Sequence, residues 1–145
     1  MSAPNDLLAE AELLAQGRLS PARRRTVVSR AYYAACHFLM LSPEAAAFRP
    51  QQGAGEGSHR QFIRFLTTHP NTTVKFAGRK LDGLYGRRIL ADYYLAKEPT
   101  NEMVKESIED AIEIVREIFA EEEWQEKVAS GIGSTTSSRS PPRRR

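Results

Sequence analysis

The stretch SPARRRTVVSRAYYAACHFLM, from Ser20 to Met40, decides the fold class of this chain of 145 residues. Its start is a strong helix signal, because a serine side chain caps free backbone amides and Pro21 suits the first helical position. The apolar residues that follow recur at helical spacing, as Val28, Ala31, Tyr32, Ala35 and Leu39. The stretch therefore predicts one long helix over residues 21–40 with a buried apolar stripe.

Two polar side chains, Arg30 and His37, interrupt the apolar part of this stretch. Seven residues correspond to about 700° of helical rotation, so both side chains leave the same face, about 20° apart. Their Cα atoms would lie about 10 Å apart along the axis, a gap that Tyr33 could bridge. A charge among apolar residues is costly unless it is paired or faces a cleft. Arg30 therefore either makes a structural ion pair, for instance with Asp92, beside an ordinary bundle histidine, or it forms a functional site with His37.

The flanking segments also follow helical patterns. The apolar residues between Leu7 and Leu14 lie at helical spacing, and Gly17 suits a helix end. The Pro and Gly content of RPQQGAGEG predicts a loop. The residues SHRQ at 58–61 fit a capping box, which would open a short helix that Pro70 ends.

The second half of the chain carries two more helical patterns. One lies around residues 79–95, although two glycines weaken it, and it places on one side Leu81, Leu84, Tyr85, Arg88, Ile89 and Asp92. The other is the clearest in the chain and keeps its spacing through Val104, Ile108, Ala111, Ile112, Val115, Ile118 and Phe119. No strand pattern competes, so the sequence predicts an all-α, up-and-down bundle of four to five helices.

Charge and composition divide the chain into a body and a tail. The net charge of +3 includes four arginines beyond Val128, and subtracting these four leaves the body at −1. The body is close to neutral, with local clusters RRR at 23–25 and EEE at 121–123, so any contact with RNA must come from a local patch. We expect a helical domain over residues 1–128, followed by a disordered basic tail over residues 129–145 that is rich in Gly, Ser and Pro.

The sequence also excludes several classes of protein. No run of about 18 apolar residues exists that could span a membrane, and the acidic start lacks the apolar centre of a signal peptide. The single cysteine, Cys36, cannot form an internal disulfide and lies within an apolar run. It therefore reads as a small packed hydrophobic residue of a reducing compartment. We expect a cytoplasmic protein without membrane contact.

No metal or cofactor motif is present. The chain has no CxxC, HExxH, P-loop or GxSxG pattern, and its three histidines are scattered. A second Arg–His spacing occurs at Arg64 and His69, but five residues turn two side chains about 140° apart on a helix. His69, next to Pro70, is more simply explained as a helix-end residue. The sequence predicts no cofactor and leaves Arg30 and His37 as the candidate site.

Three segments together resemble the HEPN family. They are VVSRAYYAACHFLM, GSHRQFIRFL and LYGRRILADYYL, followed by a long amphipathic last helix. The resemblance covers roughly residues 6–125 and is to small stand-alone bacterial and archaeal members. These members carry an R-A-Y-Y-A-x-x-H segment and a later R-x-x-A-D-Y segment in the order found here.

The resemblance implies a dimerising bundle of four or five helices and, for many members, a metal-independent ribonuclease that uses an Arg and a His. Arg30 and His37 match the catalytic element, while the supporting residues implied are Tyr33, Arg88 and Asp92. The implied partners are an RNA substrate, a second copy of the chain and, for toxin-type members, a minimal nucleotidyltransferase antitoxin.

These residue types suit RNA cleavage. RNA carries its own nucleophile in the 2′-OH, so an enzyme needs a proton acceptor and a cation for the charge that develops on the phosphate. A histidine, with a reference pKa of about 6.5, exchanges protons near neutrality, and an arginine presents a planar fork to phosphate oxygens. Two alternatives stay open: a non-catalytic HEPN module that binds nucleotide or RNA or regulates a nucleotidyltransferase, and a helical scaffold whose basic tail does the binding.

Overall fold

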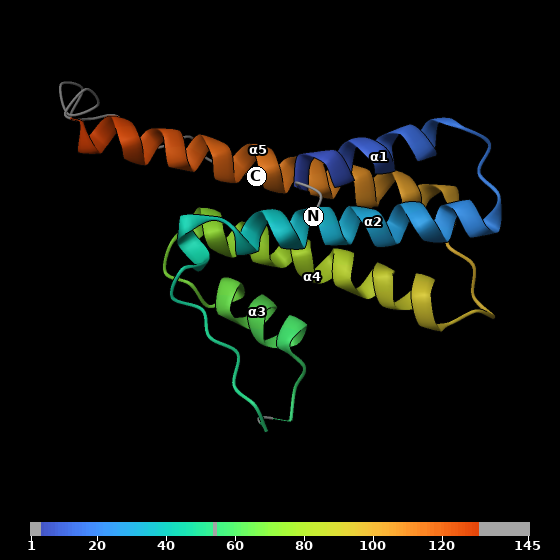
Figure 1. Ribbon diagram of the computed structural model, residues 1–145, viewed down its shortest axis with the longest axis horizontal. Coiled ribbons are helices and arrows are strands. Elements are labelled where there is room, and N and C mark those ends of the chain that lie inside the picture. Colours follow the sequence, from blue (N-terminus) through green and yellow to red (C-terminus); the bar gives the residue numbers. More distant parts are fainter. Residues whose placement is uncertain (1–3, 54, 131–145) are drawn as a thin grey trace.

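The computed structural model describes residues 4–53 and 55–130, and within these ranges it contains five α-helices, one 3-10 turn and no strand (Figure 1). The elements are α1 (Pro4–Gln16), α2 (Pro21–Met40), η1 (Pro43–Ala45), α3 (Ser58–Thr67), α4 (Thr72–Tyr93) and α5 (Asn101–Ala129). None of the described helices is long and apolar enough to cross a membrane. The all-α prediction is therefore confirmed. The expected tail lies outside the described residues, apart from Ala129, which ends α5, and Ser130, which follows it.

Helix α2 occupies the centre of the bundle. It packs against α1, α4 and α5, while α5 also packs along α4, and the shorter α3 lies on α4 (Figure 1). The main core contains fully buried side chains of four helices, among them Tyr32, Phe62, Leu81, Leu84, Ile114 and Ile118. Helix α2 therefore packs against three of the other four α-helices, and Tyr32, Tyr33 and His37 lie on the part of it that faces α3 and α4.

The start of α2 follows the sequence prediction. Ser20 is the N-cap and its side chain accepts a hydrogen bond from the backbone N–H of Arg23, and Pro21 is the first helical residue. The start of α3 differs from the sequence prediction. Its N-cap is Gly57, without a side-chain cap, so the expected capping box at residues 58–61 is wrong. Gln61 instead binds the preceding loop, since its amide accepts from the N–H of Gln51 at 2.7 Å and donates to the carbonyl of the same residue at 2.9 Å.

Two expectations about the last helices need correction. Helix α4 begins at Thr72 rather than near residue 79, because Asn71 caps it by accepting hydrogen bonds from the N–H groups of Thr73 and Val74. In α5, Phe119 is 57% exposed, whereas Ile114, which the expected stripe omitted, is fully buried. The buried apolar stripe of α5 lies on the face that is turned to α2 and α4. A helix of 29 residues can carry further apolar side chains outside this face.

Gly78 sets how closely α3 approaches α4. A Cβ at this position would lie 2.7 Å from Cβ of Leu66 and 2.9 Å from the backbone nitrogen of Thr67. We expect Gly78→Ala to lower the free energy of unfolding by about 1–3 kcal/mol, because the crossing helix must shift. Gly86 in the same helix has nothing within 4 Å of such a Cβ, so Gly86→Ala should stabilise by up to about 1 kcal/mol. Urea denaturation of both variants checks the contrast, and equal effects would contradict the close approach.

Two arginines of the RRR cluster fasten the connection between α4 and α5. Arg24 donates from Nε to the carbonyl of Pro99 and from Nη1 to that of Leu19, each at 2.7 Å. Arg25 donates to three carbonyl groups, those of Ala91 at 2.7 Å, Leu95 at 3.0 Å and Lys97 at 3.0 Å. These two guanidinium groups therefore serve the backbone of this chain, which reduces what the cluster can offer an external anion.

Two glutamates bring their carboxyl groups together where η1 meets α5. Burial, followed by the facing carboxyl of Glu44, raises the pKa of Glu122 to about 7. The folded state therefore holds a proton that the unfolded state releases at lower pH. The contribution of the Glu122 carboxyl to the free energy of unfolding is therefore fully present below about pH 4.5. It is lost as the pH rises through about 7.

Removing the charge of Glu122 should therefore matter only at high pH. We expect Glu122→Gln to raise the Tm at pH 8 and to change it much less at pH 5. Thermal melts at both values test this, with Glu123→Gln as the control because Glu123 is exposed. A gain that is the same at pH 5 and pH 8 would contradict the raised pKa of Glu122.

Candidate functional site

A cluster of aromatic, imidazole and charged side chains lies where α2, α3 and α4 meet. We call it the tyrosine cluster, and it consists of Tyr32, Tyr33, His37, His59, Tyr85, Arg88 and Asp92. Helical spacing brings these groups together, since Tyr33 and His37 are one turn apart on α2 and Arg88 and Asp92 are one turn apart on α4.

Arg88 is the best-anchored charge of the cluster. It is only 9% exposed, and it donates from Nη2 to the hydroxyl of Tyr33 at 2.6 Å and from Nε to Asp92 at 3.0 Å. Its guanidinium carbon also lies 5.0 Å from the centre of the Tyr33 ring and 5.5 Å from that of Tyr93. Nη1 makes no hydrogen bond within the described part of the chain, so the group retains N–H donors. The structure thus joins the three residues expected in a supporting role.

His37 lies beside the same tyrosine. Its ring centre is 5.9 Å from that of Tyr33, and its side chain is partly exposed. Among the described residues it makes no hydrogen bond to Arg30. An imidazole that is partly exposed and held against an aromatic ring can exchange protons with a bound molecule.

Arg30 leaves α2 toward α1. Its Nη1 lies 2.6 Å from Oε1 of Glu10, and both side chains are well exposed. Arg30 therefore does make an ion pair, but the expected partner Asp92 is wrong, because Asp92 accepts from Arg88 and from the hydroxyl of Ser29 at 3.3 Å. Arg30 and Asp92 still line one open groove of about 400 Å³, together with Ser29 and Arg25. The sequence-predicted arginine therefore borders the cluster rather than lying inside it.

His59, at the start of α3, is the residue that sequence reasoning missed. Its Nδ1 lies 2.6 Å from the hydroxyl of Tyr32, and its ring stacks on Tyr85 at 6.2 Å between centres. Burial lowers the pKa of His59, and the positive charge of Arg88 and the neighbouring His37 lower it further. Because the shift favours the uncharged form, His59 is a neutral imidazole at neutral pH.

The innermost groups of the cluster are held in their protonated forms. Burial raises the pKa of the Tyr32 hydroxyl far above its ordinary value, and it raises the pKa of the Cys36 thiol to about 11. A thiol that stays protonated is a poor nucleophile. Cys36 is fully buried, which confirms that it acts as a packed hydrophobic residue.

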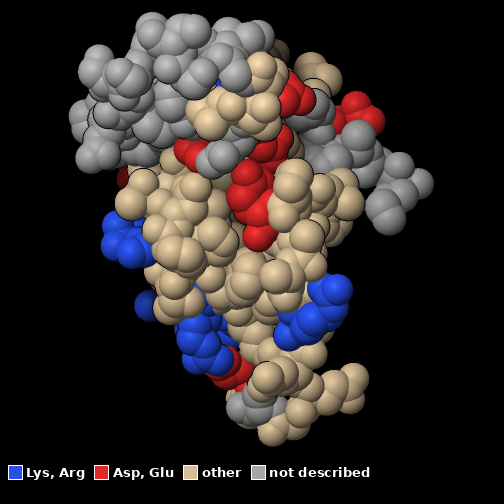
Figure 2. All heavy atoms as spheres, turned by 90° about the vertical axis from the view of Figure 1, so that its left-hand side faces the viewer, with Lys and Arg blue, Asp and Glu red and all other residues tan. Residues whose placement is uncertain are grey.

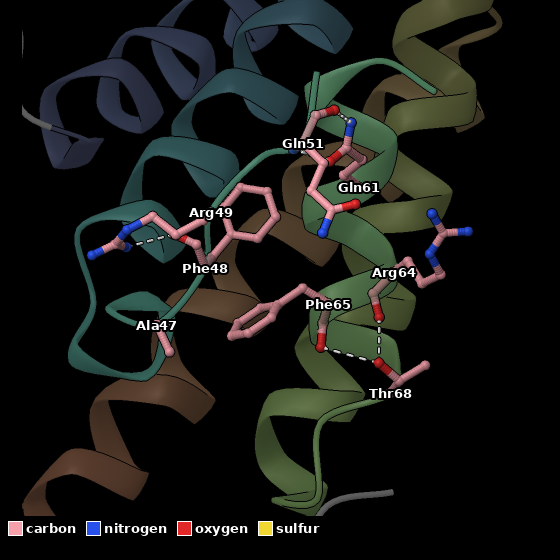
Figure 3. Close-up of a pocket in the computed structure, with 8 residues that line it drawn as sticks. All are labelled: Ala47, Phe48, Arg49, Gln51, Gln61, Arg64, Phe65 and Thr68. Carbon is pink, nitrogen blue, oxygen red and sulfur yellow. Dashed lines mark hydrogen bonds between the residues drawn. The ribbon is translucent and has the colours of Figure 1, made fainter. Parts of the chain in front are cut away.

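Outside the cluster, the ion pairs of Lys80 and Arg87 with carboxylates of α5 join α4 to α5. Figure 2 shows several acidic side chains in the upper middle of one end of the molecule, with Lys and Arg mostly lower on this face and one acidic side chain beside them. A hollow between the segment after η1 and α3 contains Phe48 and Phe65, whose ring centres are 5.5 Å apart (Figure 3). Its two arginines are engaged, since Arg49 donates to two backbone carbonyl groups and Arg64 pairs with Glu56.

The second Arg–His spacing has the structural role expected of it. His69 follows the end of α3, and its Nδ1 accepts a hydrogen bond from the backbone N–H of Asn71 at 3.0 Å. Its ring lies 5.8 Å from that of Phe65. His69 therefore belongs to the turn between α3 and α4 and serves as a natural control for the other two histidines.

Comparison of the chain with models of known protein families, with curated proteins and with solved structures gives no match. Within the described residues, no group of three or more His, Cys, Asp and Glu side chains is placed to hold a metal ion.

Proposed function

We propose that the protein is a metal-independent endoribonuclease of toxin type, similar to HEPN ribonucleases, which cleaves RNA by attack of the 2′-OH. One observation carries this proposal: His37 and the guanidinium of Arg88 flank the same tyrosine, Tyr33, at the surface where α2 meets α4. A proton-exchanging group and a cation are the two elements that this reaction requires of a protein.

The reaction assigns a role to each charged group. His37 accepts the proton of the 2′-OH as that oxygen attacks the phosphorus. Arg30, whose side chain is 40% exposed, contacts the phosphate oxygens from the open groove. Arg88, held by Asp92, contributes a fixed positive charge behind Tyr33.

The proposed assembly is a homodimer, which would bring two Arg30–His37 faces into one cleft and supply an acid as well as a base. Large exposed side chains adjoin the groove that Arg30 lines, namely Tyr93, Tyr94 and Leu95, each more than half exposed. Such side chains are typical of surfaces that another protein covers. A minimal nucleotidyltransferase acting as antitoxin is the second protein partner that we propose.

A second candidate function is a non-catalytic module that binds nucleotide or RNA, or that regulates such a nucleotidyltransferase. It is favoured by the state of the two arginines: Arg30 already pairs with Glu10, and Arg88 already pairs with Asp92. In a ribonuclease, the exposed Glu10 must give up Arg30 when RNA arrives, and exposed pairs of this kind are weak enough to exchange.

Cleavage of a mixed-sequence single-stranded RNA in excess EDTA tests the proposed function. We expect products with a 2′,3′-cyclic phosphate and a 5′-OH, because the attacking oxygen belongs to the RNA. An all-2′-deoxy oligonucleotide of the same sequence should bind but remain intact. Cleavage of the deoxy oligonucleotide, or activity that EDTA removes and Mg²⁺ restores, would contradict the mechanism. Binding without any cleavage would favour the non-catalytic module.

A further inference from the structure

We propose that His59 is a further group of the phosphate-binding site, beside His37, Arg30 and Arg88, and that its uncharged imidazole donates a hydrogen bond from Nε2–H to a phosphate oxygen of the RNA. This inference rests on the proposed function and deepens it, because it names how the same site holds the phosphodiester. It is carried by the position of His59 in the tyrosine cluster and by its hydrogen bond to Tyr32.

Three N–H-bearing groups from three different helices surround the ring of Tyr33. The ring centre of His37 lies 5.9 Å from it, that of His59 lies 6.1 Å from it, and the guanidinium carbon of Arg88 lies 5.0 Å from it. A phosphate has several oxygens that accept hydrogen bonds, and donors that converge from different elements match it better than a single cation. His59 is partly exposed, so part of this residue is accessible to such a ligand.

Tyr32 determines which nitrogen of His59 carries the hydrogen. The Tyr32 side chain is fully buried, and a buried hydroxyl without an acceptor is costly. Nδ1 of His59 lies 2.6 Å from it, whereas the Cys36 thiol, the other side chain that hydrogen-bonds with it, is only a weak acceptor. The Tyr32 hydroxyl therefore donates to Nδ1, and neutral His59 keeps its hydrogen on Nε2, on the far side of the ring.

The surroundings of His59 keep it uncharged. On the α2 side it faces Tyr32, Tyr33, Cys36 and His37, and on the α4 side it faces Tyr85 and Arg88. Among these neighbours there is no carboxylate, and burial and the positive charge of Arg88 lower its pKa. His59 is thus a poor proton acceptor at neutral pH and a fixed hydrogen-bond donor.

This donor complements the proton transfers of the proposed reaction without joining them. The 2′-O–H bond breaks and its proton passes to His37, the O2′–P bond forms and the P–O5′ bond breaks. The departing O5′ takes a proton from His37 of the second copy. His59 transfers no proton. It donates a hydrogen bond from Nε2–H to the non-bridging oxygen on which negative charge increases.

Three variants separate a donor from a proton-transfer group. We expect His59→Ala to lower kcat about 100-fold, the size of effect seen when one such donor is removed. His59→Gln should stay within about tenfold of the wild type, because the glutamine amide still offers an N–H donor. The control His69→Gln should leave cleavage unchanged. The pH profile of His59→Gln should match that of the wild type.

Several results would overturn the inference. If His59→Gln is as inactive as His59→Ala, or if its pH profile loses a limb, then His59 transfers protons. If His59→Ala cleaves as well as the wild type, the group does not touch the phosphate. Circular dichroism must show that both variants fold. If they do not, NMR of the wild-type protein tests the inference instead.

The unmutated protein allows a test that does not require activity. With ¹⁵N-labelled histidine, NMR at pH 7.5 should show His59 with hydrogen on Nε2, and Tyr32→Phe should weaken that preference. Adding the all-2′-deoxy oligonucleotide should shift the Nε2 resonance of His59. If the wild type binds this probe through His59 but never cleaves RNA, the proposed ribonuclease fails while the phosphate site stands. If the wild type cleaves RNA without any shift at His59, the phosphate contact of His59 fails while the proposed ribonuclease stands.

Discussion

Replacing His37 with alanine should lower RNA cleavage by about 1,000-fold and leave the fold intact. The loss is expected because a positioned acid–base group contributes about 100- to 10,000-fold to a rate. The fold should survive because His37 is partly exposed and, within the described residues, makes ring contact with Tyr33 rather than a buried hydrogen bond. Single-turnover cleavage of RNA, beside circular dichroism and sedimentation, measures both expectations.

His69 supplies the matched control. Its imidazole accepts a hydrogen bond within the turn after α3 and lies outside the tyrosine cluster. His69→Ala should therefore retain cleavage even if it costs some stability. If His37→Ala cuts RNA as fast as the wild type, the assignment of His37 fails and the binding-module alternative becomes the better explanation.

Replacing Asp92 with alanine should lower the free energy of unfolding by about 2 kcal/mol. The change leaves Arg88, which is only 9% exposed, with the Tyr33 hydroxyl as its remaining polar partner among the described residues. Breaking a fully buried ion pair costs about 3–5 kcal/mol. The smaller value is expected here because the Asp92 side chain is 29% exposed and water screens the pair.

Asp82 provides a control from the same helix. It forms an ion pair with Arg60 at 3.6 Å, and both side chains are more than half exposed. Asp82→Ala should therefore change stability by less than about 0.5 kcal/mol. Urea denaturation of both variants distinguishes the cases, and an equally small effect of Asp92→Ala would mean that the tyrosine cluster does not depend on this carboxylate.

Much of the helical framework could be predicted because its signals are local. Ser20 and Pro21 define the start of α2 by chemistry that depends only on the adjacent residues. The predicted start of α4 is wrong although its cap, Asn71, is a local signal, whereas other residues act through distant contacts. Gly78 has a low helix propensity, yet its missing side chain allows α3 to pack closely on α4. Gln61 resembles a capping residue but binds a loop ten residues earlier.

The candidate site was predictable only along single helices. Helical spacing pairs Tyr33 with His37 and Arg88 with Asp92, and the structure keeps both pairs. The bond from Arg88 to Tyr33 joins residues 55 positions apart, and that between Tyr32 and His59 joins residues 27 apart. Whether such groups meet depends on the path of the intervening loops. The one available signal for His59 was a histidine at the start of a helix, directly after a glycine-rich loop.

The carbonyl contacts of Arg25 have a consequence for ligand binding. The same guanidinium that holds three carbonyl groups around the end of α4 also lines the groove that contains Arg30. An anion in that groove and the connection from α4 to α5 therefore compete for one cation. By thermodynamic linkage, any anion that draws Arg25 toward itself loosens the connection, and any partner that tightens the connection weakens the affinity for the anion by the same factor. The groove and the chain around the end of α4 are in this sense two sites that share one arginine.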